Sequence, residues 1–241
     1  MAYAIEIKNL RKEYGAKVAV NNINLNIEEG CLFSLLGVNG AGKTTTIKML
    51  TGLAVPTSGD AYILGHSIRE DINAVKSIVN VSTQETSVAP NLTVRENLEF
   101  IAGIYGMDKG KSKQRVDEVI EQFNLHEVEK NKAKTLSGGW QRKLSIAMAL
   151  ITEPRILFLD EPTLGLDVLA RRELWRVIEG LKSKITVILT THYMEEAESL
   201  SDSIAIMVDG CIKASGTLDE LLKLTGADNL ENAFIKIAEE I

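Results

Sequence analysis

Apolar and polar positions alternate in parts of this chain and follow a helical period in others. Near the N-terminus, apolar residues alternate with polar ones at Ile5, Ile7, Ile23, Leu25 and Ile27. A two-residue period of this kind is typical of half-buried strands. Turn signals at residues 14–15 and 28–30 separate these stretches, so the pattern predicts short antiparallel strands in the first 30 residues.

Strands and helices are predicted to alternate in much of the remaining chain. Short apolar runs predict strands at residues 32–36, 61–64, 78–82, 155–159, 186–191 and 203–208. Helical periods predict helices at residues 44–53, 168–181, 194–200, 218–224 and 230–239. A hairpin signal at residues 209–210 precedes a further strand at residues 211–214. Alternation of strands and helices predicts an α/β fold with a parallel sheet covered on both faces.

One long region interrupts this alternation. Between residues 93 and 150 the apolar positions follow a helical period, and no strand pattern occurs. The positions that carry this period are Val94, Leu98, Ile101, Ile104, Val116, Val119, Ile120 and Phe123. We therefore predict a mostly helical insertion, and the lack of linkers or repeats predicts a single domain over residues 1–241.

Composition narrows the class of protein. The chain is 45% hydrophobic and 25% charged, with a formal net charge of −6; it has no overall basic field, so we expect no nucleic-acid partner. No apolar run approaches the roughly 20 residues that span a bilayer, and the N-terminus lacks a secretory signal. We expect Cys31 and Cys211 to be buried, reduced thiols in a soluble intracellular protein.

The strongest motif is a phosphate-binding loop. Residues 37–44, GVNGAGKT, fit the pattern G-x-x-x-x-G-K-S/T. The glycines let the backbone wrap a phosphate, and the helix that follows aims its positive N-terminus at the phosphate. A predicted strand precedes the loop and a predicted helix follows it, as the motif requires. The loop therefore predicts nucleotide binding, with Lys43 as a point charge on the β- and γ-phosphates.

Two acidic residues end a predicted strand. Asp160 and Glu161 follow the apolar run at residues 155–159, at the strand edge where open α/β sheets bind ligands. We expect Asp160 to hold Mg²⁺ together with the hydroxyl of Thr44, and Glu161 to act on the attacking water as a general base. The alternative is that both acids merely cap the next turn, but the phosphate-binding loop favours the catalytic interpretation.

A second anion-binding site is predicted at Ser137, Gly138 and Gly139. These residues precede an apolar helix predicted at residues 144–151, and a helix N-terminus attracts anions. The alternative is an ordinary helix N-cap, a position for which Ser137 is well suited. Two following glycines weaken a helix start, which favours a close approach of the backbone to a ligand.

With these motifs in this order, the chain resembles the ATP-binding subunits of ABC transporters along nearly its whole length. The resemblance implies a P-loop NTPase core with a parallel sheet, an N-terminal antiparallel β-subdomain and an inserted helical subdomain at about residues 93–150. ATP and Mg²⁺ are the implied ligands. Without the resemblance, Tyr14 is also compatible with an exposed strand-end tyrosine, and His192 with a solvent-facing histidine.

The resemblance assigns roles to individual residues. Tyr14 matches the adenine-stacking aromatic, Gln84 the Q-loop glutamine, Asp167 the D-loop and His192 the switch histidine. The nucleotide-binding residues it implies are Tyr14, Gly37, Asn39, Gly40, Ala41, Gly42, Lys43, Thr44, Thr45, Gln84, Ser137, Gly138, Gly139 and Asp167. The implied catalytic residues are Glu161, His192 and Lys43, and the implied metal ligands are Thr44, Gln84 and Asp160.

The resemblance also implies partners. Two such subunits form a head-to-tail dimer around two ATP molecules, as a homodimer or with a related subunit, and hydrolysis opens the dimer to drive a separate membrane permease. The protein would then lie on the cytoplasmic face of the membrane. Residues 142–147, 165–167, 171–175 and 191–197 are similar to the bacterial ABC-2 exporter branch, although Trp140 and Val168 depart from the family pattern. The alternatives are an antibiotic-sensing or self-immunity complex and a soluble, non-transport ATPase.

Overall fold

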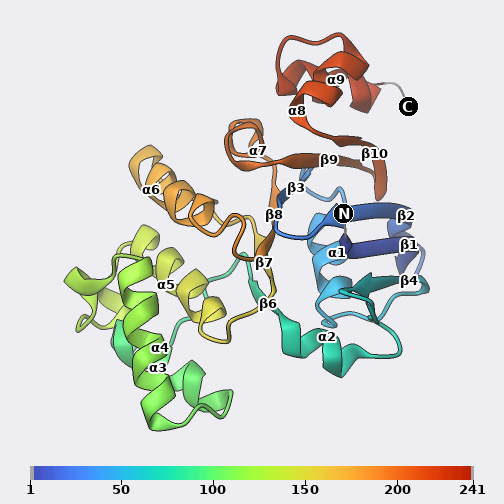
Figure 1. Cartoon of the computed structure of the whole chain (residues 1–241). Coiled ribbons are helices and arrows are strands. Elements are labelled where there is room, and N and C mark those ends of the chain that lie inside the picture. The colour runs from blue at the N-terminus through green and yellow to red at the C-terminus, as the bar shows by residue number, and fades with distance from the viewer. Residues whose placement is uncertain (1–2, 240–241) are drawn as a thin grey trace.

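Two β-sheets organise the protein, whose structure is a computed structural model describing residues 3–239 (Figure 1). The smaller sheet is antiparallel, in the order β2 (Lys17–Glu28), β1 (Tyr3–Tyr14), β4 (Ser58–Ile63) and β5 (His66–Ser67). The larger sheet has the order β10 (Cys211–Gly216), β9 (Ser203–Val208), β3 (Leu32–Leu36), β8 (Thr186–Thr191), β7 (Ile156–Asp160) and β6 (Val79–Ser82). All neighbours in it are parallel except β10 and β9. The predicted α/β fold is confirmed.

The N-terminal hairpin is longer than predicted. Strands β1 and β2 each have 12 residues, whereas the sequence pattern indicated short strands. Their pairing shifts register between Ile7 and Leu10 and again around Lys12, and Asn9 and Asn22 have positive φ. Each irregularity inserts a residue and reverses the side-chain alternation, so the two-residue period is visible only in fragments of each strand.

The central strands of the larger sheet are fully buried. Every residue of β3, β7 and β8 is buried, which explains their continuous apolar runs and is typical of a parallel sheet covered on both faces. The predicted hairpin between β9 and β10 is present. Its two turn residues, Asp209 and Gly210, have φ of 47° and 77°, the left-handed conformation that tight hairpins require.

Helices cover the larger sheet and its edge. They are α1 (Lys43–Leu50), α2 (Ile72–Ile78), α6 (Val168–Glu179), α7 (Met194–Leu200), α8 (Leu218–Thr225) and α9 (Leu230–Glu239). The sequence pattern missed α2, because this helix has seven residues and buries only Val75, which leaves no helical period to detect. In Figure 1, α8 and α9 lie beside β9 and β10 near the C-terminus.

The region predicted to be helical does form helices, which lie together on one side of the larger sheet (Figure 1). They are α3 (Val94–Ile104), α4 (Lys109–Gln122), short 3₁₀ turns at His126–Val128 and Ala133–Thr135, and α5 (Gly138–Leu150). The predicted start of α5 at residue 144 is wrong, since the helix begins directly after Ser137. Its first turns are polar in sequence, yet Arg142 and Lys143 are buried, so the apolar run marked only the second half of the helix.

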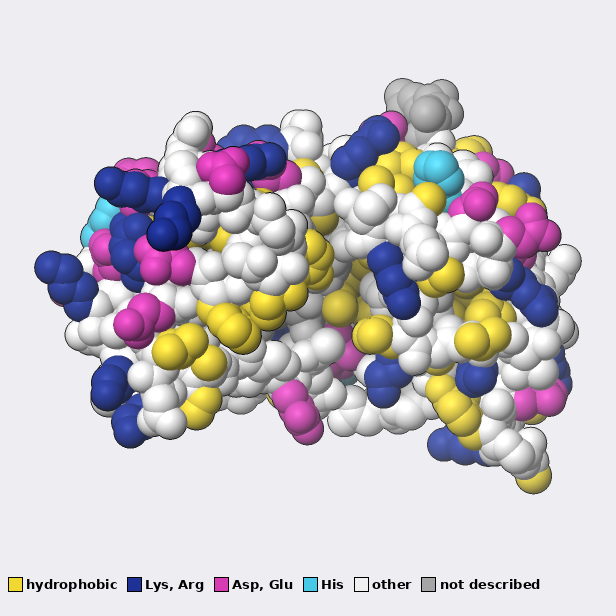
Figure 2. Space-filling view, turned by 90° about the horizontal axis from the view of Figure 1, so that it is seen from below, with side chains coloured by type: hydrophobic (Ala, Val, Ile, Leu, Met, Phe, Trp, Pro, Cys, Tyr) yellow, Lys and Arg dark blue, Asp and Glu magenta, His cyan; other side chains and the backbone are white. Residues whose placement is uncertain are grey.

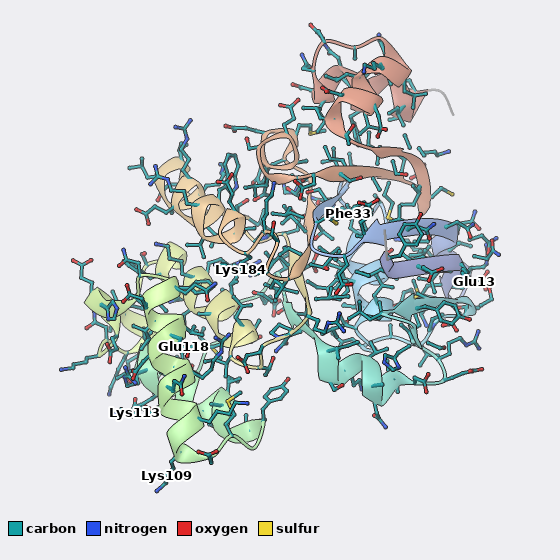
Figure 3. All side chains as sticks on the ribbon, in the orientation of Figure 1. Glu13, Phe33, Lys109, Lys113, Glu118 and Lys184 are labelled. Carbon is teal, nitrogen blue, oxygen red and sulfur yellow. The ribbon has the colours of Figure 1, made fainter. Side chains whose placement is uncertain are left out.

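Side chains of the sheet alternate between separate parts of the core. Leu157 and Leu159 of β7 pack with the helices α3–α6, whereas Ile156 and Phe158 pack toward the N-terminal sheet. Figure 3 shows Phe33 of β3, which is 2% exposed, inside this second cluster. Lys109, Lys113 and Glu118, also labelled in Figure 3, are exposed on α4.

The next features are the length and apolar character of the helices and the burial of the two cysteines. Within residues 3–239, no helix combines the length and the apolar character needed to cross a membrane. Cys31 and Cys211 are free thiols, but both are partly exposed rather than buried as predicted. Partial burial, with the negative charges of Asp202 and Glu28 nearby, raises the pKa of Cys31 to about 11, so this thiol stays protonated at neutral pH.

Candidate nucleotide-binding and catalytic site

The loop at residues 37–42 joins β3 to α1, and its path depends on glycine. Gly42, at the N-cap of α1, has a φ of +110°, and a Cβ there would lie 2.6 Å from the carbonyl oxygen of Ala19. A Cβ on Gly37 would lie 2.4 Å from the carbonyl oxygen of Met207. Neither position accepts a side chain without a backbone shift. The loop therefore leads tightly packed backbone into a helix N-terminus, an arrangement suited to phosphate.

Lys43, the first residue of α1, is buried, and its ammonium group lies against this loop. Its ammonium group donates hydrogen bonds to the carbonyl oxygens of Gly37 at 2.7 Å and Val38 at 3.2 Å. It also forms an ion pair with Glu161 at 3.1 Å, and the two side chains are only 5% and 6% exposed. The lysine thus holds the phosphate-binding loop and the end of β7 together.

Glu161 connects Lys43 to His192. One carboxylate oxygen pairs with Lys43, and the other lies 2.6 Å from Nδ1 of His192, which follows β8. The Glu161 backbone has a φ of +49° and donates N–H hydrogen bonds to Thr190. A left-handed conformation is unfavourable for a glutamate and recurs at functional sites. This backbone conformation places the Glu161 carboxylate between Lys43 and His192.

Asp160 and Thr44, the two residues expected to hold Mg²⁺, lie within hydrogen-bond distance of each other. The Thr44 hydroxyl donates to a carboxylate oxygen of Asp160 at 3.1 Å, and the Thr190 hydroxyl donates to the same oxygen at 2.6 Å. Within residues 3–239 there is no cluster of three or more His, Cys, Asp or Glu side chains that could hold a metal ion. A divalent ion here would therefore have few protein ligands, which is compatible with Mg²⁺ because that ion keeps waters and phosphate oxygens around it.

Lys43, Thr44, Glu161 and His192 line one cavity of about 370 Å³. It is lined by Lys17, Ala19, Asn39, Gly40, Gly42, Lys43, Thr44, Thr45, Gln84, Glu161, Leu164 and His192. The structure thus brings together nine of the residues singled out by sequence, from the phosphate-binding loop and from the ends of β6, β7 and β8. Asp160 lines an adjoining cavity together with Thr44 and Gln84.

Other residues singled out by sequence lie outside this cavity. Ser137 and Gly138 are exposed at the start of α5, and Gly139 lies against α6, where a Cβ on it would be 3.1 Å from that of Ala170. Asp167 is exposed and caps α6 through hydrogen bonds from the N–H groups of Leu169 and Ala170. The Ser137 hydroxyl makes no capping hydrogen bond. Gly37, Ala41 and Tyr14 do not line the cavity either.

Tyr14 stays close to the cavity without lining it. It is 52% exposed at the end of β1, with the ammonium of Lys12 4.9 Å from its ring centre. Its partner across the hairpin is Lys17, which does line the cavity. Sequence analysis missed Lys17, although its place two residues after Gly15, at the end of the predicted turn, was a usable signal.

A buried glutamate next to the site was also missed. Glu196, on α7, is fully buried, and one of its carboxylate oxygens accepts hydrogen bonds from Thr163 at 2.8 Å and Trp175 at 3.0 Å. Its other oxygen has no hydrogen-bond partner among the described residues. Burial raises the pKa of Glu196 against the opposing effect of these hydrogen bonds. Nothing in the sequence distinguishes it from the exposed acidic residues beside it.

Comparison with known proteins agrees with this geometry. The family model described as "ABC transporter" matches residues 20–164, which contain the loop, Asp160 and Glu161. The chain belongs to the ABC transporter family. The membership confirms the resemblance drawn from the sequence motifs, and the match within the family is to ATP-binding subunits.

Two relatives illustrate this similarity. The chain is 39% identical over 98% of its length to "Probable multidrug ABC transporter ATP-binding protein YbhF" of Escherichia coli (strain K12), and it spans 42% of that relative. It is 39% identical over 94% of its length to "Linearmycin resistance ATP-binding protein LnrL" of Bacillus subtilis (strain 168), of which it covers 73%.

A solved structure extends the similarity to the fold. A dimeric ATP-binding cassette in a post-hydrolysis state, bound to ADP and Pi, is 28% identical to the chain with a TM-score of 0.78. The similarity covers 89% of this chain and 98% of that one. The chain therefore has the ATPase fold of the ABC family.

Proposed function

We propose that this protein is the ATP-hydrolysing subunit of an ABC transporter and that it drives export through a separate membrane permease. The Lys43–Glu161–His192 arrangement at the end of the phosphate-binding loop carries the proposal. It provides a cation for phosphate, a carboxylate for the attacking water and a histidine that orients this carboxylate. The names of the similar proteins, a multidrug transporter subunit and an antibiotic-resistance subunit, favour export as the direction. Residues 1–241 would form one ATPase domain, with a helical subdomain at about residues 93–150.

ATP binding would change the partners of Lys43. A γ-phosphate in the loop competes with Glu161 for the ammonium group, because both are anions at one cation. Glu161 then keeps its hydrogen bond to His192 and is available to take a proton from water. Thr44, Asp160 and Gln84 would hold Mg²⁺, whose charge offsets that of the phosphates.

The exposed serine-glycine motif supports an ATP-sandwich dimer. Ser137 and Gly138 are solvent-exposed and do not line the cavity of their own chain, so as anion ligands they would serve the cavity of a second subunit. Asp167 lies close to this motif, because it caps α6 and Gly139 lies against Ala170 of the same helix. Each chain has one complete set of motifs, so a homodimer would contain two complete sites. A related subunit is an equally suitable partner.

A permease would bind in the hollow between the helical region and the sheet. Figure 2 shows hydrophobic atoms gathered along this hollow, between two lobes with charged surfaces. Exposed large apolar residues on α3 and after α1 include Phe100, Ile104, Tyr105, Leu53 and Val55. Exposed apolar patches mark binding surfaces, and Leu53 of this set lines the cavity next to the site together with Gln84. The protein would therefore be peripheral on the cytoplasmic face of the membrane.

The decisive experiment for the enzymatic part compares ATP hydrolysis by the parent, Glu161→Gln and Lys43→Ala. We expect Glu161→Gln to bind ATP but to lose about 10²–10⁴-fold in kcat, the usual contribution of a general base, and to form an ATP-stabilised dimer on size exclusion. Lys43→Ala should lose ATP affinity. Parent-like turnover by Glu161→Gln would remove Glu161 from the base role.

Purification of the tagged chain from solubilised membranes tests the transporter part. Recovery of a multi-span membrane protein with the chain would support it. Recovery only from the soluble fraction, with ribosomes or nucleic acid attached, would overturn it and leave the ATPase intact.

A further inference from the structure

Arg142 is a buried cation that joins α5 to the backbone after β6 and to the backbone at the end of β7. It lies on α5, five residues after Ser137, and is 4% exposed. Its guanidinium group donates to four backbone carbonyl oxygens: Thr83 at 2.5 Å, Gln84 at 3.1 Å, Asp160 at 2.8 Å and Pro162 at 2.7 Å. Among the described residues, no carboxylate lies within ion-pair distance of it. All of its hydrogen bonds therefore go to backbone.

These four carbonyl groups lie at or just beyond the carboxyl ends of two neighbouring strands. The pairing between β6 and β7 ends at Ser82 and Leu159, and only Asp160 among the four residues is still paired, with Thr190 of β8. Carbonyl oxygens at such a point lose their partners in the sheet, and buried carbonyl groups without partners are unfavourable. Arg142 supplies these partners from α5.

Negative charges nearby also stabilise the buried guanidinium group. Burial lowers the pKa of Arg142 to about 10, and the negative charges of Asp160, Glu196 and Glu161 oppose this effect. The group therefore stays charged at neutral pH, and hydrogen bonds from a charged donor are stronger than neutral ones.

We propose that Arg142 is a positioning residue that couples the position of α5 to the backbone of Gln84 and of the Asp160–Glu161 turn. The proposal rests on the proposed roles of Gln84, Asp160 and Glu161. A movement of α5, which carries Ser137 at its start, must either carry both segments or break these bonds. Contact of Ser137 with a nucleotide is thereby linked to the placement of the metal ligands and the general base.

The geometry requires an arginine. Its planar group presents N–H donors in several fixed directions, and here Nε, Nη1 and Nη2 all donate. A lysine ammonium of similar reach is a single donor group. It cannot bind the carbonyl groups that follow β6 and those at the end of β7 at the same time. Arg142→Lys keeps the positive charge and removes the planar arrangement of N–H donors, so it is a sharper test than Arg142→Ala.

The test measures ATP hydrolysis by the full chain as a function of ATP and Mg²⁺. For Arg142→Lys and Arg142→Ala we expect kcat to fall by about tenfold to a hundredfold, as misplacement of reacting groups by an ångström does. The KM for ATP should change much less, because Arg142 makes no contact with the phosphate-binding loop. The Mg²⁺ concentration for half-maximal activity should rise several-fold.

Arg115→Ala is the matched control. Arg115, on α4, also donates to backbone carbonyl oxygens, those of Leu150 at 2.7 Å and Ile151 at 3.4 Å, but these lie at the far end of α5 from the site. It should lower the melting temperature without changing the Mg²⁺ dependence. If Arg142→Lys folds and keeps kcat and Mg²⁺ dependence within twofold of the parent, the proposal is wrong. If Arg142→Lys loses activity while Glu161→Gln stays active, the result would instead contradict the general-base role of Glu161, on which the proposal rests.

Discussion

The ion pair between Lys43 and Glu161 predicts an unusual stability profile for Glu161→Gln. Both side chains are almost fully buried, and Glu161 is the only carboxylate in an ion pair with Lys43 among the described residues. The substitution removes this negative charge and leaves the lysine buried. ATP phosphates would restore a negative charge next to Lys43. The variant should therefore be less stable than the parent without ATP and should gain more stability from ATP.

The burial of this ion pair sets the expected loss of stability. Removal of one partner from a buried ion pair costs about 3–5 kcal/mol. Glutamine keeps an oxygen that can accept from Lys43, and the lysine keeps its bonds to Gly37 and Val38, so we expect the lower end, about 3 kcal/mol. For a chain of this size, each kcal/mol shifts the melting temperature by about 2–4 °C. The expected loss without ATP is thus about 6–12 °C.

Thermal denaturation with and without Mg²⁺-ATP measures both quantities. If the triphosphate fully replaces the lost charge, the same 3 kcal/mol should make ATP bind to Glu161→Gln up to about a hundredfold more tightly than to the parent. Glu153→Gln is a suitable control, because Glu153 also has a left-handed backbone, with a φ of 53°, but lies on an exposed turn away from the cavity. It should melt within about 1 °C of the parent, as surface substitutions usually do.

One outcome would refute this reasoning. If Glu161→Gln without ATP melts within about 1 °C of the parent and gains the same stabilisation from ATP, the ion pair contributes nothing to either state. The competition between Glu161 and phosphate for Lys43 would then be discarded. Loss of hydrolysis in the same variant would still support the general-base role.

Three further predictions follow from the packing. Gly42→Ala forces a Cβ to 2.6 Å from the carbonyl oxygen of Ala19 and should cost several times more stability in urea denaturation than Gly226→Ala, a position that also has a positive φ but has open space around it; equal losses would contradict the close approach. Glu196 has a pKa raised above its ordinary 4.5, so its stabilising contribution is complete below that value and is lost as pH rises through the higher, folded-state pKa. The melting temperature of Glu196→Gln relative to the parent should therefore rise as the pH is raised above 4.5, and a difference that does not change with pH would contradict the raised pKa of Glu196. Trp140→Gln should leave ATP hydrolysis within about threefold, since the Trp140 ring packs against the core and the ammonium of Lys143, and the proposed phosphate ligands at this motif are Ser137 and backbone N–H groups; a collapse of activity would show that Trp140 itself contributes to the site.

Local features could be predicted from sequence because each depends on neighbours along the chain. The phosphate-binding loop is contiguous, and its geometry follows from Gly42 and the flanking strand and helix. The central strands were predicted well because they are buried on both faces. The same reliance on local pattern explains the errors. Register shifts concealed the length of β1 and β2, and the polar first half of α5 concealed its start.

The catalytic arrangement was decided by the tertiary structure. Lys43, Glu161 and His192 are distant in sequence, and the motifs indicated that each was important without giving their distances. Parallel β3, β7 and β8 place their carboxyl ends at one edge, which brings the three side chains into one ion-paired and hydrogen-bonded chain. Arg142 shows the same principle more strongly. Its four partners are backbone carbonyl groups, which every residue has, so no pattern of side chains in the sequence could reveal them.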